Sequence, residues 1–124
     1  MKTYSVVVVG QRPWTTNQER KKGSHYQRSA VTKWWREAFR DAALEAEIPH
    51  FDSIRIEVTP ILPDRRIQDT GACFPTAKAA IDGLVDAGVI DDDAPQYVPT
   101  ITFHAPVICR EGGLEILIIP EVQK

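Results

Sequence analysis

The spacing of apolar residues along the chain predicts two amphipathic helices. From Ser29, which can cap a helix, to about Ala46, apolar side chains recur every three or four positions and form one stripe. A second helix is expected from Pro75, a residue favoured at the first helical position, to Gly88, a residue favoured at a helix end. The first stripe comprises Val31, Trp34, Trp35, Ala38, Phe39, Ala42 and Ala43, and the second comprises Ala77, Ala80, Ile81, Leu84 and Val85.

Other segments have the apolar pattern of β-strands. Residues 3–9 form a nearly continuous β-branched run, which is typical of a buried central strand. Residues 54–58 alternate between apolar and polar side chains, which predicts a half-buried strand closed by Pro60 and Pro63. Two more strands are expected at residues 97–109 and 114–119, joined by a turn at residues 110–113.

The predicted order of elements is therefore β-α-β-α-β-β. With 124 residues, of which 43% are hydrophobic and 26% charged, the chain has the composition of an ordinary soluble globular domain. We expect residues 1–124 to form one α/β domain, in which two helices pack on a mixed sheet. No apolar run approaches the ~20 residues of a membrane helix. The two isolated cysteines are typical of reduced thiols, so a cytoplasmic location is expected.

The cysteines and histidines do not form a metal-binding pattern. Cys73 and Cys109 lack C-x-x-C spacing, and we expect both to be reduced thiols rather than zinc ligands. His25, His50 and His104 are scattered, which argues against a histidine-based metal site.

Charge is distributed unevenly along the chain. Residues 1–40 carry nine Lys or Arg against two Glu, whereas residues 41–124 carry six Lys or Arg against fifteen Asp or Glu. This split predicts a basic surface for a polyanion and a separate acidic region. The alternative, that folding interleaves the charges, is equally consistent with the sequence.

Acidic residues flank the second predicted helix. Asp69 precedes it, and Asp91, Asp92 and Asp93 follow it. Such carboxylates, with waters and substrate phosphates, are ligands that Mg²⁺ prefers, and a nearby lysine such as Lys78 can stabilise charge on a phosphate. A solvated acidic loop explains the same aspartates. Within the helix, Asp82 can brace Lys78 four positions away, and Asp86 is expected to be a tolerated surface residue.

Three motifs in this region resemble the RusA family of Holliday junction resolvases. They are PDRRIQD at residues 63–69, KAAIDGLVDAG at residues 78–88 and the DD pair at residues 92–93. The family has PDRR-x-x-D-x-D-N, then a helix of the type K-x-x-x-D-x-L-x-x-A-G, then D-D. The length, the order of elements and a Pro/Asn/Arg loop after the first strand are also similar, so the resemblance spans nearly the whole chain.

The resemblance implies a homodimer that binds four-way DNA junctions and nicks two strands symmetrically with Mg²⁺, or with Mn²⁺. It implies that Asp69, Lys78 and Asp93 are catalytic, and that Asp69, Asp92 and Asp93 bind the metal. Asp82 matches a helix aspartate with a structural role. The candidate dimer surfaces are Trp34, Trp35 and the C-terminal strands.

Basic and polar residues near the N-terminus are the candidate DNA contacts. Contacts between such side chains and phosphates supply salt-sensitive affinity and little base information, as suits an enzyme that reads branch shape. Most lie in residues 10–27, expected to be a long exposed loop, or on the polar face of the first helix. The candidates are Arg12, Asn17, Arg20, Lys21, Lys22, Arg28, Lys33, Arg36 and Arg40, together with Arg65 and Arg66, for which a surface ion pair is an equally good interpretation.

One position departs from the family pattern. Where the family has D-x-D-N, this chain has Asp69, Thr70, Gly71 and Ala72, followed by an apparent insertion before Lys78. Loss of the second aspartate should weaken metal binding unless Asp91, Asp92, Asp82 or backbone carbonyls replace it. Two other functions therefore stay open: a DNA-binding protein without cleavage activity on the same fold, and a nuclease that acts on forks or flaps.

Overall fold

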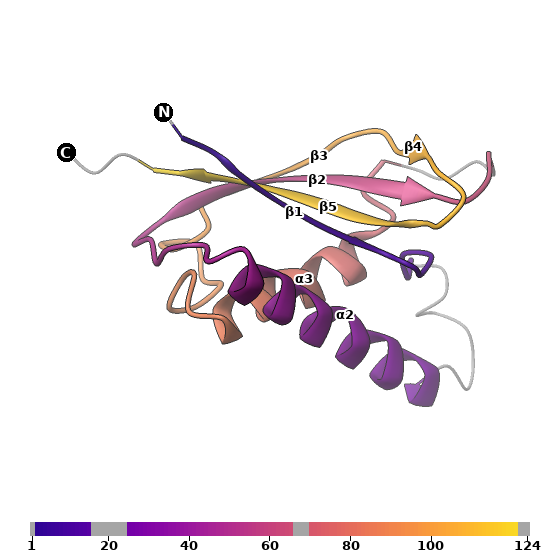
Figure 1. Ribbon diagram of the computed structural model, residues 1–124, viewed down its shortest axis with the longest axis horizontal. Helices are drawn as coiled ribbons and strands as arrows, with labels where there is room; N and C mark the ends of the chain where they lie inside the picture. Colours follow the sequence, from indigo (N-terminus) through magenta and orange to yellow (C-terminus); the bar gives the residue numbers. More distant parts are fainter. Residues whose placement is uncertain (1, 16–24, 66–69, 122–124) are drawn as a thin grey trace.

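Two helices cover one face of a five-stranded sheet (Figure 1). The computed structural model describes residues 2–15, 25–65 and 70–121, except for the side chains of residues 25–28. The elements are β1 (Tyr4–Val9), α2 (His25–Glu45), β2 (Ile54–Leu62), α3 (Phe74–Asp86), β3 (Thr100–Phe103), β4 (Val107–Ile108) and β5 (Gly113–Pro120). The α/β fold class is confirmed.

The sheet is mixed, as expected. Its order is β1-β5-β2-β3, and β4 pairs with β2 beyond the end of β3. β5 runs antiparallel to both β1 and β2, whereas β3 and β4 run parallel to β2. The last strand of the chain thus lies between the first two.

The core lies between the sheet and the helices. On β2 the side chains of Ile54, Ile56 and Val58 are fully buried, and those between them point to the opposite face. From the helices, Trp35 and Phe39 are also fully buried in this core. The second predicted stripe packs into the core, whereas the first does so only in part, because Trp34 is 40% exposed. No helix of the described residues covers the other face of the sheet (Figure 1).

β1 is an edge strand, so its prediction as a buried central strand is wrong. Val6 and Val8 face the core, but Val7 and Val9 are each 46% exposed. The continuous apolar run suggested burial on both faces. Strand order depends on which distant segments pair, and here β5 takes the central place beside β2.

β2 continues past Pro60 to Leu62, so of the two prolines predicted to close the strand only Pro63 follows its end. The carbonyls of Val58 and Leu62 accept hydrogen bonds from the β3–β4 side, and by strand alternation Pro60 faces that same side. β3 has already ended at this point and β4 has not begun. A residue without an N–H is therefore tolerated inside the strand.

The single strand predicted at residues 97–109 is two short strands, β3 and β4, separated by residues 104–106. Both pair with β2 on the side opposite to β5. β4 and β5 are consecutive but do not pair with each other, so the turn at residues 110–113 does not form a hairpin.

The helices agree with the sequence prediction except at one end. α2 begins at His25, four residues before the predicted cap at Ser29, and α3 contains Pro75 in its first turn. Within the described ranges, no helix combines the length and apolarity needed to cross a membrane. Both cysteines are free: Cys109 is exposed, and burial raises the pKa of the Cys73 thiol to about 11.

Candidate functional site

The end of α3 directs the chain back toward the helix. Gly88 has a φ of 82° and its N–H donates to the carbonyl of Val85, while the N–H of Val89 donates to the carbonyl of Leu84, each at 3.0 Å. This pair of hydrogen bonds is the Schellman motif, which ends a helix and reverses the chain. Val89 and Leu84 are both fully buried, which fixes the reversal. The following segment carries Asp93 back along α3.

Lys78 lies between two carboxylates in this arrangement. Its Nζ donates to Oδ1 of Asp82, one turn further along α3, at 2.9 Å. It also donates to Oδ2 of Asp93, fifteen residues away in the chain. The structure thus brings together two of the three predicted catalytic residues, Lys78 and Asp93, and adds Asp82.

Lys78 and Asp93 hold each other in their charged forms. Partial burial lowers the pKa of Lys78, but the hydrogen bonds to Asp93 and Asp82 outweigh it, so the pKa lies above its usual value. The hydrogen bond from Lys78 lowers the pKa of Asp93. Lys78 is therefore a protonated cation and Asp93 an anion at neutral pH.

The other two aspartates of the run have separate roles. Asp92 accepts a hydrogen bond from the backbone N–H of Asp93 at 2.8 Å, so it shapes the loop that carries Asp93. Asp91 was expected to be solvated, and its side chain is 69% exposed. Its Oδ1 lies 3.0 Å from Nε2 of His50.

Two described carboxylates, those of Asp92 and Asp93, are of the type that binds a hard cation. Mg²⁺ is commonly held by one or two carboxylates together with waters and substrate phosphates, and Asp92 and Asp93 supply such carboxylates. Among residues 2–15, 25–65 and 70–121, no three His, Cys, Asp or Glu side chains converge as a metal-binding group. Asp69, the remaining predicted ligand, lies outside the described residues.

The segment after β1 packs against both flanks of the segment that contains Asp69. Arg12 donates to Asp64, just after β2, at 3.2 Å. The hydroxyl of Thr76, in the first turn of α3, donates to the carbonyl oxygen of Trp14 at 2.7 Å, and Thr76 is 1% exposed. The start of the predicted DNA-binding loop is therefore anchored beside the first turn of α3, the helix that carries Lys78.

Several predicted DNA contacts form ion pairs with carboxylates of this chain. Arg36 donates to both oxygens of Asp86, at 2.6 and 2.8 Å, which raises the pKa of Arg36 and lowers that of Asp86. Lys33 lies 3.9 Å from Glu37, and Arg40 lies 2.9 Å from Asp41. Arg65 is exposed. Asn17, Arg20, Lys21, Lys22 and Arg66 lie outside the described residues, as does the side chain of Arg28.

In the folded chain, several basic residues of the N-terminal third therefore lie beside carboxylates, which reduces the charge asymmetry that the sequence shows. Arg12, Lys33, Arg36 and Arg40 each have a carboxylate partner. Asp86, expected to be only a tolerated surface residue, joins α3 to α2. The sequence holds no signal for this pair because its members are fifty positions apart.

Gly71 occupies the position of the second aspartate in the family motif and has a φ of 90°. This left-handed conformation favours glycine, and a side chain there would be strained even though nothing lies within 4 Å of an added Cβ. The carbonyl of Gly71 accepts a hydrogen bond from the N–H of Phe74, so the loop leads directly into α3. Glycine at position 71 therefore suits the left-handed backbone of this loop.

Comparison with known proteins supplies no assignment, because neither a protein-family model nor a curated protein sequence matches the chain.

Proposed function

We propose that this protein is a Mg²⁺-dependent endonuclease that binds four-way DNA junctions and resolves them by paired nicks. The observation that carries the proposal is the contact between Lys78 and Asp93. The resemblance to the RusA family implies that these two residues share an active site, although one lies in a helix and the other in a later loop. Their contact is what that hypothesis requires.

The position of the N-terminal segment gives independent support. Arg12 and Trp14 contact the two flanks of the segment that contains Asp69. Trp14 contacts the first turn of α3, the helix that carries Lys78, and the side chain of Lys78 is 47% exposed. The start of the predicted DNA-binding loop thus lies beside the helix proposed to carry the phosphate chemistry.

The residues of this chain have distinct parts in the proposed reaction. Asp93, with Asp92 and Asp69, would hold Mg²⁺, which supplies polarisation of the scissile phosphate and activation of a water. Lys78 is kept protonated by its carboxylate neighbours and stabilises negative charge that develops on the phosphate. Asp82 positions Lys78 through their hydrogen bond. Without a bound cation the carboxylates would repel the DNA backbone, so cleavage requires divalent metal.

A second candidate function is junction binding without cleavage. The observation in its favour is Gly71, which replaces an aspartate of the family motif and adopts a backbone conformation that aspartate rarely adopts. This protein would bind branched DNA in a salt-sensitive manner and leave it intact.

The deciding experiment is cleavage of end-labelled four-way junctions with Mg²⁺ or with EDTA. It compares the native chain with Asp93→Asn, and uses Asp91→Asn as a matched control from the same acidic run. Paired nicks that require Mg²⁺, vanish in Asp93→Asn and persist in Asp91→Asn would support the resolvase. Binding without nicks under any divalent cation would support the second candidate. Nicking of forks or flaps in preference to junctions would refute junction specificity while leaving the nuclease assignment intact.

A further inference from the structure

An aromatic side chain lies at the start of the exposed face of α3. Phe74 is 48% exposed, and Lys78 follows it at the four-residue spacing that places two side chains next to each other on a helix. Thr76 and Ala77, which lie between them in the sequence, are buried. Phe74 is therefore a surface neighbour of the residue proposed to stabilise charge on the phosphate.

A second aromatic residue supports the ring of Phe74. Phe103, at the end of β3, has its ring centroid 6.1 Å from that of Phe74, with an angle of 48° between the two ring planes. Phe103 is itself partly buried against the core, whereas about half of Phe74 stays in contact with solvent. The ring of Phe74 is thus already oriented, so a ligand that stacks on it orders few additional side-chain rotamers.

The neighbours of Phe74 indicate a function that exposure alone does not, because single apolar side chains are common on protein surfaces. Two residues further along α3, the hydroxyl of Thr76 donates to the carbonyl of Trp14 at 2.7 Å, so the start of the predicted DNA-binding loop reaches the same helical turn. Lys78 has three N–H donors, of which Asp82 and Asp93 accept two, and a phosphate can accept the third. An aromatic ring and a cation thus lie side by side where the chain is proposed to bind DNA.

We propose that Phe74 stacks on a nucleobase at the branch point of the bound DNA while Lys78 contacts a phosphate of the same strand. This inference rests on the proposed function and names the feature of the substrate that the site would recognise. Aromatic side chains stack on any base, because every base has a π face. The ring and the ammonium group therefore match the two parts of one nucleotide.

Stacking on Phe74 would distinguish a branch from a continuous duplex. Within a duplex each base is covered on both sides by its neighbours, and an apolar side chain can enter only where these bases are unstacked. At a branch point, where paired arms meet, the stack opens at lower cost. Phe74 is therefore a specificity-determining residue that recognises the shape of the substrate and not its base sequence. It lies in the insertion before Lys78, so the family motif assigns it no role.

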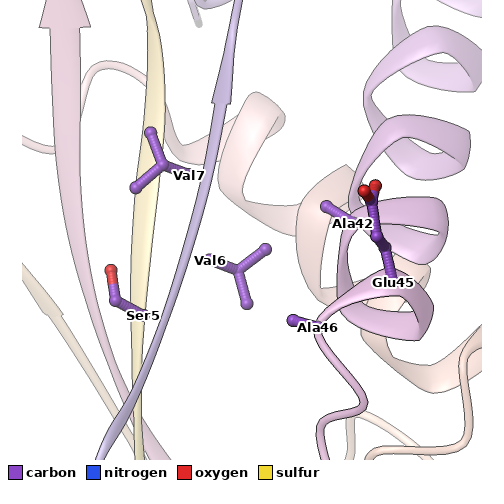
Figure 2. Close-up of a pocket in the computed structure, with 6 residues that line it drawn as sticks. All are labelled: Ser5, Val6, Val7, Ala42, Glu45 and Ala46. Carbon is purple, nitrogen blue, oxygen red and sulfur yellow. The ribbon is translucent and has the colours of Figure 1, made fainter.

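The cavity between β1 and α2 suits a nucleotide less well. It has a volume of about 240 Å³, and Figure 2 shows Val6 pointing from β1 toward the side of Ala42 and Ala46. The described residues that line it include no aromatic ring and no cation, and the carboxylate of Glu45 would repel a phosphate. The lining residues are Ser5, Val6, Val7, Ala42, Glu45 and Ala46.

Equilibrium binding in EDTA tests the stack without cleavage. The probes are a labelled four-way junction and the same junction with abasic residues at the branch point of all four strands, which keeps every phosphate. The native chain should bind the abasic junction about tenfold more weakly, the effect of losing one base–aromatic stack. Phe74→Leu keeps an apolar side chain against Phe103 but has no flat π face. It should bind both junctions equally, and the intact junction about tenfold more weakly than the native chain does.

Two further variants of the full chain serve as controls. Phe74→Tyr retains an aromatic ring and should show the tenfold discrimination between the two junctions. Leu44→Ala removes a side chain that is 55% exposed in the last turn of α2, and it should discriminate as the native chain does. Thermal unfolding of each variant confirms that it folds, and the comparison of the two junctions with the native chain needs no variant.

Equal affinity of the native chain for the two junctions would overturn the proposal. So would a Phe74→Leu variant that keeps the tenfold discrimination, because the ring would then only pack against Phe103. Junction binding that does not depend on Phe74 would overturn this inference and leave the proposed function intact. A native chain that binds neither junction would overturn both.

Discussion

Arg36 and Asp86 join the two helices through two hydrogen bonds, from Nε to Oδ2 at 2.6 Å and from one terminal guanidinium nitrogen, Nη2, to Oδ1 at 2.8 Å. Asp86 lies at the end of α3, where the helix dipole disfavours an anion, and Arg36 compensates for this cost. A residue considered for DNA binding thus also fastens α2 against α3. The Arg36–Asp86 pair gives folding stability a specific dependence on pH.

We expect Asp86→Asn to lower the free energy of unfolding by about 1 kcal/mol at neutral pH, the upper end for partly exposed ion pairs. Arg36 lowers the pKa of Asp86 below the usual value of 3.8, so the pair stabilises the fold above about pH 4. This contribution is lost as pH falls through the lowered pKa, when Asp86 becomes protonated. Urea unfolding of the native chain and the variant, measured from neutral to acidic pH, should show curves that converge at low pH.

Asp41→Asn is the matched control, because within the described part of the chain the ion pair of Asp41 is with its neighbour Arg40 and does not join two elements. It removes the same charge and should leave stability nearly unchanged. Equal losses in Asp41→Asn and Asp86→Asn would show that net charge, rather than the contact between the helices, accounts for the effect.

The two helices also approach closely at Gly83. A Cβ added there would lie 2.4 Å from the carbonyl oxygen of Arg36 and 2.9 Å from the backbone nitrogen of Arg40. Backbone atoms cannot move aside, so Gly83→Ala should destabilise the fold by about 2–3 kcal/mol. The sign of the change in unfolding free energy is diagnostic, because replacing glycine by alanine at a freely exposed helical position would stabilise the fold by about 1 kcal/mol. Chemical denaturation distinguishes the two, and a more stable variant would refute the close packing.

Local patterns in the sequence predicted the elements that depend on nearby residues. Trp35 and Phe39 of the first predicted stripe face the core, and Gly88 follows the end of α3, as its sequence signal predicts. Lys78 and Asp93 were placed in one site by resemblance, and they are in contact.

Features that depend on pairing between distant segments could not be read in the same way. The valine run of β1 looks like a central strand because periodicity reports apolar character and not strand order. Pro60 looks like a strand end because proline lacks an N–H. The strand continues through it because no strand pairs with Pro60 in the gap between β3 and β4, which the local sequence does not reveal. The Arg36–Asp86 pair has no sequence signature at all. Each of these features is a property of the assembled sheet and helices.

Lys78→Ala should reduce junction nicking by about a hundredfold or more, the effect of removing one group that stabilises transition-state charge. Asp82→Asn should have a smaller effect, because Asp93 continues to hold Lys78. Single-turnover nicking rates at saturating enzyme measure both, and junction binding in EDTA serves as the control for folding. Equal rates for Lys78→Ala and the native chain would remove Lys78 from the mechanism.

Gly71 offers a test of the missing aspartate. Gly71→Asp would return a carboxylate to the position that the family motif occupies, at a cost of about 1 kcal/mol for a side chain at positive φ. If the loop faces the proposed metal site, the added carboxylate should lower the Mg²⁺ concentration needed for half-maximal nicking. A Mg²⁺ titration of the nicking rate measures this shift.

Gly71→Asn is the matched control for that titration. Asparagine has nearly the same shape as aspartate and a similar tolerance of positive φ, so both variants should lose the same stability. Only Gly71→Asp adds a negative charge, so only that variant should need less Mg²⁺. Identical titrations for the two variants would show that Gly71 points away from the cation, because a carboxylate beside the metal must change its affinity. The proposed site would then hold its cation without a carboxylate at position 71, and the glycine would serve the path of the loop into α3.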